Sequence, residues 1–239
     1  MTTTSQGVAV TGFALASPFG QDADRFWQGL CHGPTPTSTW SAPGYEDLAW
    51  SAVRLRQEDR PTGQQPSGLH PPAALAVDLV RRALEDAGLP RASQDAGLAM
   101  GSHFAETDYL AERPGVVPPP MLESVVHELG FTGPVANTPI GCAAGNLSLS
   151  WATDRVRDRQ AEVMVAGGVD LFGAGAMGTF QLFDNVSETV PRPFSADRDG
   201  FLLGEGGAML VLESRRHAAR RGARILATAV GTGNGHDGS

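Results

Sequence analysis

The chain contains no lysine, because all 18 of its basic residues are arginine. This absence excludes catalysis through a lysine Schiff base and phosphate binding by a P-loop lysine. Cysteine is nearly absent as well. The two that occur, Cys31 and Cys142, stand far apart and do not have the spacing of metal ligands. Two isolated cysteines are typical of a protein in a reducing compartment rather than of a disulfide scaffold. We therefore expect a cytoplasmic protein without a metal site, and no motif in the sequence calls for a cofactor.

Long hydrophobic runs are also missing, and the first residues lack the basic and apolar regions of a signal peptide. The formal net charge of -8 argues against nucleic acid or an anionic membrane as the main partner. With 239 residues, of which 41% are hydrophobic and 18% charged, the chain is predicted to be globular. We expect one domain, residues 1–239, that binds neither nucleic acid nor a membrane.

Apolar runs typical of buried strands alternate with segments of helical periodicity, which predicts the α/β class. The predicted strands cover residues 7–16, 97–101, 161–168, 207–213 and 225–230. The predicted helices cover residues 22–30, 72–88, 121–129, 145–160 and 215–221. Residues 31–72 are rich in proline, glycine, serine and threonine, so we expect a surface loop region there, with one strand near 50–55.

Cys142 lies in the segment NTPIGCAAGN, residues 137–146, where an extended stretch gives way to a predicted helix. A thiol in the first turn of a helix lies among unpaired backbone N–H groups, which favour its thiolate. Gly141 and Ala143 beside it are small, so another molecule can approach the sulfur. A small buried hydrophobe is the alternative interpretation of an isolated cysteine. The surrounding segment favours a nucleophile.

Four segments, taken in order, carry a resemblance to a known family. They are VAVTGFALASPFG at 8–20, GCAAGN at 141–146, VMVAGGVD at 163–170 and RPFSADRDGFLLGEGG at 192–207. Together they resemble the N-terminal half of the β-ketoacyl synthases, condensing enzymes of fatty-acid and polyketide assembly. The resemblance implies the N-terminal half of a thiolase-like layered fold, in which a mixed sheet is flanked by helices.

The resemblance also implies where the acyl group is bound. Cys142 falls on the family's nucleophile, which accepts an acyl group from an acyl carrier protein or coenzyme A thioester. Its backbone N–H would be one donor of the oxyanion hole. The positions implied to line the acyl channel are Ala176, Met177 and Phe180, with Phe104 reaching across a dimer interface. Plain core packing is the alternative for Phe180.

A charged scaffold beside the site is a further implication of the resemblance. Its members are Asp197, Arg198, Asp199 and Glu205. We predict a structural rather than a catalytic role for them, because charges of opposite sign can satisfy one another. The resemblance also makes the segment before Cys142 a central strand. Pro139 would remove a ladder hydrogen bond there, so we predict that the strand ends before it.

The family's C-terminal half supplies two histidines, a lysine and a second oxyanion donor, and this sequence contains no counterpart of that half. Five histidines are predicted to be solvated or helix-capping, namely His32, His70, His103, His127 and His217. His236 falls where the family places residues near the substrate entrance, but one histidine does not replace the missing pair.

The leading hypothesis is therefore a split β-ketoacyl synthase. This chain would bear the nucleophile and a separate chain the histidines, in a dimer of heterodimers that takes acyl groups from an acyl carrier protein. The reaction would be decarboxylative Claisen condensation with a malonyl-type extender. A stand-alone cysteine acyltransferase or thioesterase is one alternative, although the sequence shows no evident base beside the thiol. Two others are a non-catalytic subunit like a chain-length factor, against which the retained cysteine argues, and a truncated sequence.

Overall fold

A six-stranded sheet forms the centre of the computed structural model, which describes residues 7–41, 46–61, 68–89, 95–104, 120–187, 190–235 and 238. The strands are β1 (Val8–Ala16), β4 (Gly97–Gly101), β5 (Val135–Asn137), β6 (Val163–Asp170), β7 (Gly206–Glu213) and β8 (Ala227–Ala229). Their order across the sheet is β5-β4-β6-β7-β1-β8. Strand β4 runs parallel to β5 and β6, whereas β7 runs antiparallel to β6 and β1. The mixed sheet expected from the resemblance is therefore confirmed.

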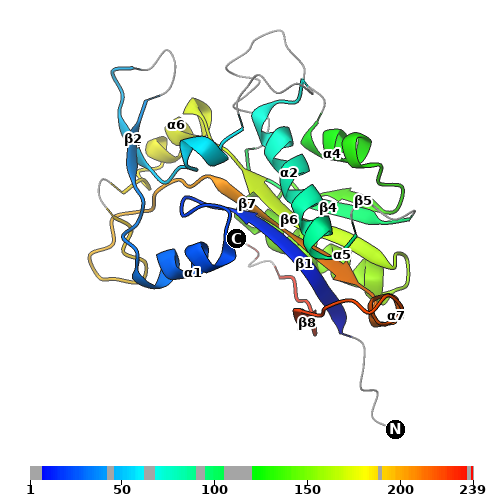
Figure 1. Ribbon diagram of the computed structural model, residues 1–239. Helices are drawn as coiled ribbons and strands as arrows, with labels where there is room; N and C mark the ends of the chain where they lie inside the picture. The colour runs from blue at the N-terminus through cyan, green and yellow to red at the C-terminus, as the bar shows by residue number, and fades with distance from the viewer. Residues whose placement is uncertain are drawn as a thin grey trace.

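Helices cover both faces of this sheet (Figure 1). On one face α2 (Pro71–Asp86) packs on β1, β6 and β7, and α4 (Met121–Leu129) packs beside it. On the other face α5 (Ala144–Arg157) packs on β4 and β6. The alternation of β6 divides the core between the two faces, since Val163 and Val165 join the α2 side and Met164 and Ala166 join the α5 side. Among the described helices, none combines the length and the hydropathy that crossing a lipid bilayer requires.

Helix α2 shows why the predicted periodic segment forms a helix. His70 precedes it, is 2% exposed, and accepts a hydrogen bond from the backbone N–H of Ala73 at 3.4 Å. The prolines at its first two positions have no N–H to satisfy there. After the helix, Gly88 adopts φ +70°, a conformation that favours glycine. The prediction of a capping role for His70 is confirmed, although this histidine is buried.

The strand predicted near residues 50–55 is confirmed, but the region 31–72 is more than the surface loop expected around that strand. It holds a hairpin of β2 (Ser38–Trp40) and β3 (Trp50–Ala52), whose two tryptophan rings lie 5.6 Å apart between centroids. Trp50 and Ala52 are buried in a cluster with Phe172 and with Met177 of helix α6 (Ala174–Leu182). Scattered aromatic residues in a proline-rich segment gave no periodic signal, because their partners lie far away in the sequence.

Several element boundaries differ from the predicted ones. Helix α5 ends at Arg157, three residues early, and Arg159 just beyond it has a positive φ of 61°. Strand β5 lies at the edge of the described sheet, not at its centre, and it ends at Asn137. Pro139 therefore interrupts no ladder, so the predicted early end of the strand is confirmed and its central position was wrong.

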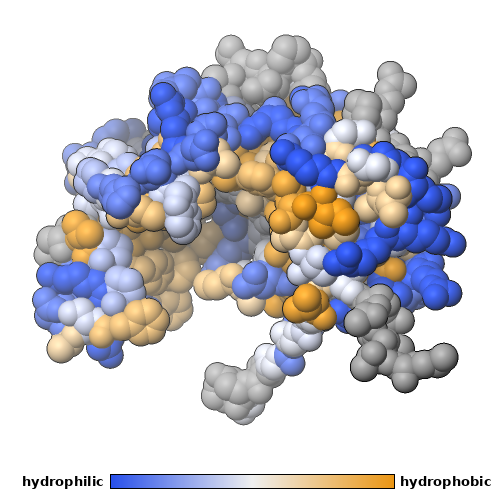
Figure 2. All heavy atoms as spheres, turned by 60° about the horizontal axis from the view of Figure 1, so that its bottom comes forward, coloured by the Kyte–Doolittle hydropathy of each residue, from blue (hydrophilic) through white to orange (hydrophobic). Residues whose placement is uncertain are grey.

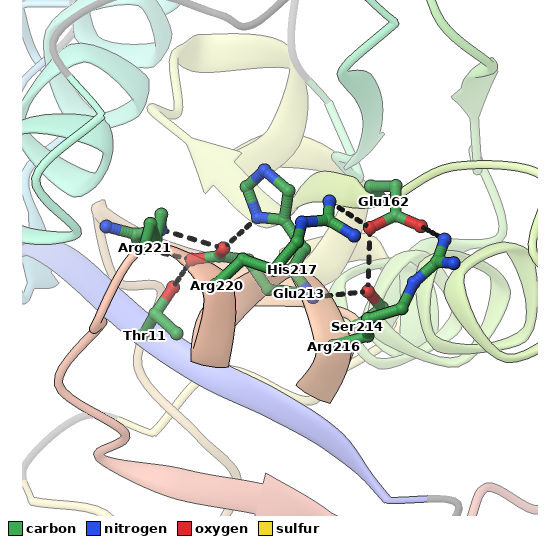
Figure 3. Close-up of polar contacts among 8 residues, drawn as sticks. All are labelled: Thr11, Glu162, Glu213, Ser214, Arg216, His217, Arg220 and Arg221. Carbon is green, nitrogen blue, oxygen red and sulfur yellow. Dashed lines mark hydrogen bonds and ion pairs between the residues drawn. The ribbon is translucent and has the colours of Figure 1, made fainter.

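A buried ionic network ties β7 to β1 and to the short helix α7 (Arg215–Arg220), as Figure 3 shows. The carboxylate of Glu213 is fully buried and hydrogen-bonds to Thr11, His217 and Arg221. Burial alone would raise the pKa of this carboxyl, but the hydrogen bonds outweigh burial and hold its pKa below the ordinary value. His217 is thus neither solvated nor a cap through its side chain, which corrects the prediction made for it. The contact of His217 with Glu213 was not predicted, because the sequence alone does not show that Glu213 is buried.

Candidate active site

Cys142 lies in η2 (Gly141–Ala143), a short 3-10 helix that leads directly into α5. Its thiol is exposed. Gly141 before it has φ +73°, a conformation that favours glycine and turns the chain sharply from β5 toward the helix. The predicted placement of this cysteine at the start of a helix is confirmed.

The hydroxyl of Thr138 fixes this turn to the sheet. It lies 3.1 Å from the carbonyl oxygen of Met100 on β4, and 2.9 Å from that of Ala144 at the start of α5. It is also 2.8 Å from the hydroxyl of Ser148, one turn further along α5. All three contacts are buried, so the turn that carries Cys142 is held against β4 without depending on the cysteine itself.

Helix α5 approaches the sheet closely because Gly101 has no side chain. A Cβ at this position would lie 2.3 Å from the carbonyl carbon of Ala144 and 2.7 Å from the backbone nitrogen of Gly145. Gly168 on β6 faces the same helix start. The first turn of the helix therefore rests on the backbone of the two strands.

His103 reaches the thiol of Cys142, which the sequence analysis did not anticipate. It follows β4, and its Nδ1 lies 3.8 Å from Sγ of Cys142. The prediction that His103 is solvated agrees with its exposed position, but its contact with the thiol was not predicted. Strands β4 and β5 run parallel, so the residues that follow their carboxyl ends meet at one edge of the sheet. That relation between strands was the signal that could have identified it.

The carboxylate of Asp170, at the end of β6, orders the backbone around His103. It accepts hydrogen bonds from the backbone N–H of His103 at 2.9 Å and of Phe104 at 3.1 Å. It also accepts one from the hydroxyl of Ser102 at 2.6 Å. The imidazole itself stacks on the ring of Phe104 with centroids 4.1 Å apart. These contacts fix where the histidine leaves the strand.

A cavity of about 440 Å³ opens beside the cysteine and the histidine. Aromatic side chains form much of its wall: Phe104, Phe172, Phe180 and Phe201. The ring of Phe180 makes edge-to-face contacts with Phe104 at 5.7 Å and with Phe201 at 5.0 Å between centroids. An apolar cavity with a thiol at its edge is suited to an acyl chain.

The four residues predicted to line an acyl channel divide into two pairs. Phe104 and Phe180 line the cavity of this chain. Ala176 and Met177 are buried in the aromatic cluster with Trp50 and are absent from the described cavity wall. On α6 they occupy the inward face, so they support the wall from behind.

Glu205 is the buried carboxylate of this cavity, with 3% exposure. It pairs with Arg54 at 3.3 Å and Arg60 at 2.9 Å, both from the proline-rich region. The backbone N–H of Leu55 also donates to it, at 3.2 Å. Burial raises the pKa of the Glu205 carboxyl, and the charge of Arg54 opposes this shift. Its cationic partners were missed because they lie about 150 residues away in sequence.

The remaining members of the predicted charged scaffold lie away from the described cavity wall. Asp197 and Asp199 each contact Arg192 at 3.5 Å, and Arg198 donates to the carbonyl oxygen of Ser195 at 3.0 Å. The hydrogen bond from Ser195 lowers the pKa of the exposed Asp197. The prediction that these charges satisfy one another needs a correction, since the acidic residues pair with Arg192 and not with Arg198. His236 lies outside the described residues.

Comparison with known proteins establishes the family. Residues 5–218 match the family model described as the β-ketoacyl synthase N-terminal domain, and the chain belongs to this family. It is 32% identical to nodulation protein E of Rhizobium leguminosarum bv. trifolii over 95% of this chain and 62% of that protein. It is 31% identical to the tetracenomycin polyketide synthase ketoacyl synthase alpha subunit of Streptomyces glaucescens, over 94% of this chain and 61% of that protein.

A solved structure, the ishigamide ketosynthase/chain length factor, superimposes with a TM-score of 0.81 at 25% identity. The match covers 95% of this chain and 62% of that one. The described fold is thus the N-terminal half of a thiolase-like layered fold. The chain spans 62% of the length of the first relative it matches.

Proposed function

We propose that Cys142 is the acyl-accepting nucleophile of a β-ketoacyl synthase active in fatty-acid or polyketide biosynthesis. The observation that supports this is an exposed thiol at the start of α5, at the edge of an apolar cavity of about 440 Å³. The donor would be the thioester of an acyl carrier protein, as the family resemblance implies. The acyl chain would extend along the aromatic wall that Phe104 and Phe180 form.

The acylation of Cys142 involves only its thiol, its backbone N–H and the thioester. The sulfur of Cys142 attacks the thioester carbonyl, and the negative charge develops on the carbonyl oxygen, where the backbone N–H of Cys142 would stabilise it. The tetrahedral intermediate then expels the donor thiol, which receives the proton that Cys142 has lost. The products are acyl-Cys142 and a free carrier thiol, so no oxidant or metal takes part in this step.

Condensation with a malonyl-type extender requires further groups besides Cys142. We propose that two histidines and a second oxyanion donor come from a separate chain in a hetero-oligomer, arranged as a dimer of heterodimers. Large apolar side chains are exposed at the end of α6 and further along the chain, with Leu182 89%, Phe183 67% and Phe194 102% exposed. In Figure 2 apolar side chains stand on both sides of a hollow in the molecular surface. Exposed apolar surface of this kind suits contact with further protein.

Intact-mass measurement after incubation with an acyl-loaded carrier protein tests the acylation. We expect a single acyl adduct on the wild type and on Cys31→Ala within the first turnover, and none on Cys142→Ala. Cys31 is a matched control because it is also an exposed cysteine, on helix α1 (Ala23–His32). An adduct that persists in Cys142→Ala would contradict the proposal.

A condensation assay tests the split arrangement. The protein is given acyl and malonyl carrier proteins with and without a candidate partner chain. We expect the ketoacyl product only when the partner is present. Condensation by this chain alone would refute the two-chain proposal, whereas a Cys142 that iodoacetamide does not alkylate would favour a structural subunit of the chain-length-factor type.

A further inference from the structure

We propose that Cys142 and His103 form a catalytic pair that cleaves acyl thioesters with water. This activity uses only residues that the structure describes, and it rests on the proposed acylation of Cys142. The substrate class is a thioester with an apolar acyl chain that fits the aromatic cavity. The distance of 3.8 Å between Nδ1 and Sγ is the observation that carries the proposal.

The imidazole has several neighbours, although His103 is exposed. Its backbone N–H donates to Asp170 at 2.9 Å, and its ring lies parallel to that of Phe104, with 6° between the planes. The ring edge-to-face contact with Phe180 is 5.8 Å between centroids. A Cβ at Gly141 would lie 3.6 Å from Cε1 of His103. Two aromatic rings and the turn that carries the cysteine therefore orient the histidine, which stays accessible to solvent.

The carboxylates near Cys142 and His103 are already engaged with other partners, so the imidazole of His103 is the base. The described cavity wall contains two carboxylates, Asp170 and Glu205. Asp170 is occupied by the backbone N–H groups and the hydroxyl that it accepts. Glu205 is occupied by Arg54 and Arg60. Within the described wall, His103 is the side chain that hydrogen-bonds to the sulfur.

The first half of the reaction is thiolysis. The imidazole takes the proton of the Cys142 thiol, and the sulfur forms a bond to the thioester carbonyl carbon. The carbon–sulfur bond of the substrate then breaks, and the imidazolium returns its proton to the departing thiol. The balance is thioester plus enzyme thiol giving acyl-Cys142 plus free thiol.

The second half is hydrolysis of acyl-Cys142. The imidazole removes a proton from a water molecule, whose oxygen bonds to the acyl carbonyl carbon. The bond between that carbon and Sγ of Cys142 breaks, and the imidazolium protonates the sulfur. The sum of both halves is thioester plus water giving carboxylic acid plus thiol, without any further reactant.

The test uses hexanoyl-N-acetylcysteamine as the thioester, in water labelled with oxygen-18. We expect the purified protein to release hexanoic acid with one labelled oxygen. Cys142→Ala should abolish release, and His103→Gln should slow it by about 100-fold or more, the usual contribution of a general base. The matched controls are Cys31→Ala and His127→Gln, an exposed cysteine and an exposed histidine, and both should keep the wild-type rate.

The outcomes separate this inference from the proposed function. If intact mass shows no hexanoyl adduct and no acid is released, acylation of Cys142 fails and both ideas fall. If the adduct forms but persists without release of labelled acid, acylation stands and the hydrolytic pair is overturned. If His103→Gln and His103→Asn both release acid at the wild-type rate, the histidine has no role. Circular dichroism of each variant verifies that it is folded, which the exposed position of His103 favours.

Discussion

Asp170 accepts a hydrogen bond from the backbone N–H of His103 at 2.9 Å, although Asp170 ends β6 and His103 follows β4. The same carboxylate receives the next N–H along the chain, that of Phe104. An acidic side chain on β6 thus fixes the backbone from which the imidazole extends. Asp170 is a positioning residue, because it acts through His103 and has no contact with the sulfur among the hydrogen bonds of the described residues.

Asp170→Asn should slow the hydrolysis of acyl-Cys142 by about tenfold. The amide keeps one acceptor oxygen but loses the charge, and a charge-assisted hydrogen bond contributes about 1.5 kcal/mol or more, which corresponds to about tenfold in rate. Steady-state kinetics with hexanoyl-N-acetylcysteamine is the measurement: kcat should fall while KM changes by less than about twofold. Asp158→Asn, at the end of α5, is the control. Equal loss in both variants would contradict the positioning role.

Thr138→Val should destabilise the protein and make the turn that carries Cys142 less ordered. Valine has a similar shape but lacks the hydroxyl that contacts Met100, Ala144 and Ser148. Leaving buried partners of a hydroxyl unpaired costs about 1–3 kcal/mol. Urea unfolding measures this loss, and iodoacetamide alkylation of Cys142 measures the change at the turn.

A matched variant for this prediction is Thr179→Val on α6. Its hydroxyl donates to the carbonyl oxygen of Gly175 at an exposed position, so its loss should cost less than about 0.5 kcal/mol. If Thr138→Val is no less stable than Thr179→Val, the hydroxyl does not hold the turn.

Glu213→Gln should lower the free energy of unfolding by about 3 kcal/mol at neutral pH, because it leaves Arg221 without its buried partner. The pKa of Glu213 is lower in the folded protein than its ordinary value of 4.5. Its ionic contribution is therefore present above the unfolded pKa and disappears as pH falls through the folded pKa. The stability difference between wild type and variant should shrink below about pH 4.5.

Urea unfolding at several pH values tests this sign. Glu58→Gln is the control, because Glu58 pairs with Arg56 at the surface with its side chain 65% exposed. Its loss should cost less than about 1 kcal/mol at any pH. A stability difference for Glu213→Gln that grows toward acid would show that the sign is wrong.

Phe180→Ala should broaden the acyl specificity. Removing a ring that contacts both Phe104 and Phe201 enlarges the cavity, so octanoyl or branched thioesters should gain about tenfold over hexanoyl in acylation rate. Competition between thioesters, read by intact mass, provides the ratio. Phe183→Ala removes a ring of the same size that is 67% exposed and outside the described cavity wall, and the ratio should not change. An unchanged ratio in Phe180→Ala would mean that the acyl chain lies elsewhere.

The periodic elements were predictable because their signals are local. The segment of α2 carries its apolar stripe and its terminal glycine within 18 residues, and the helix start near Cys142 was predicted from the change of an extended stretch into a helical pattern. The contact between His103 and Cys142 was not predictable in this way. It depends on the parallel pairing of β4 with β5, which no neighbouring residue encodes.

The role of the proline-rich region was missed for the same reason. Arg54 and Arg60 belong to a segment with little periodicity, and their partner Glu205 lies in another part of the chain. The family motif drew attention to Glu205 but not to the cations that pair with it. Charges on irregular segments can be assigned to partners only after the fold brings them together.

The absence of a side chain at position 101 sets the distance between Sγ of Cys142 and Nδ1 of His103. Proton transfer between these atoms is sensitive to fractions of an ångström. Any substituent there would overlap the backbone at Ala144 and lift the first turn of α5 off β4. Cys142 would move with that turn, while His103 would stay with the strand. The distance between sulfur and nitrogen therefore depends on a residue that has no functional group. A substitution at this residue would change the reactivity of the thiol by moving the helix, without altering either reacting group.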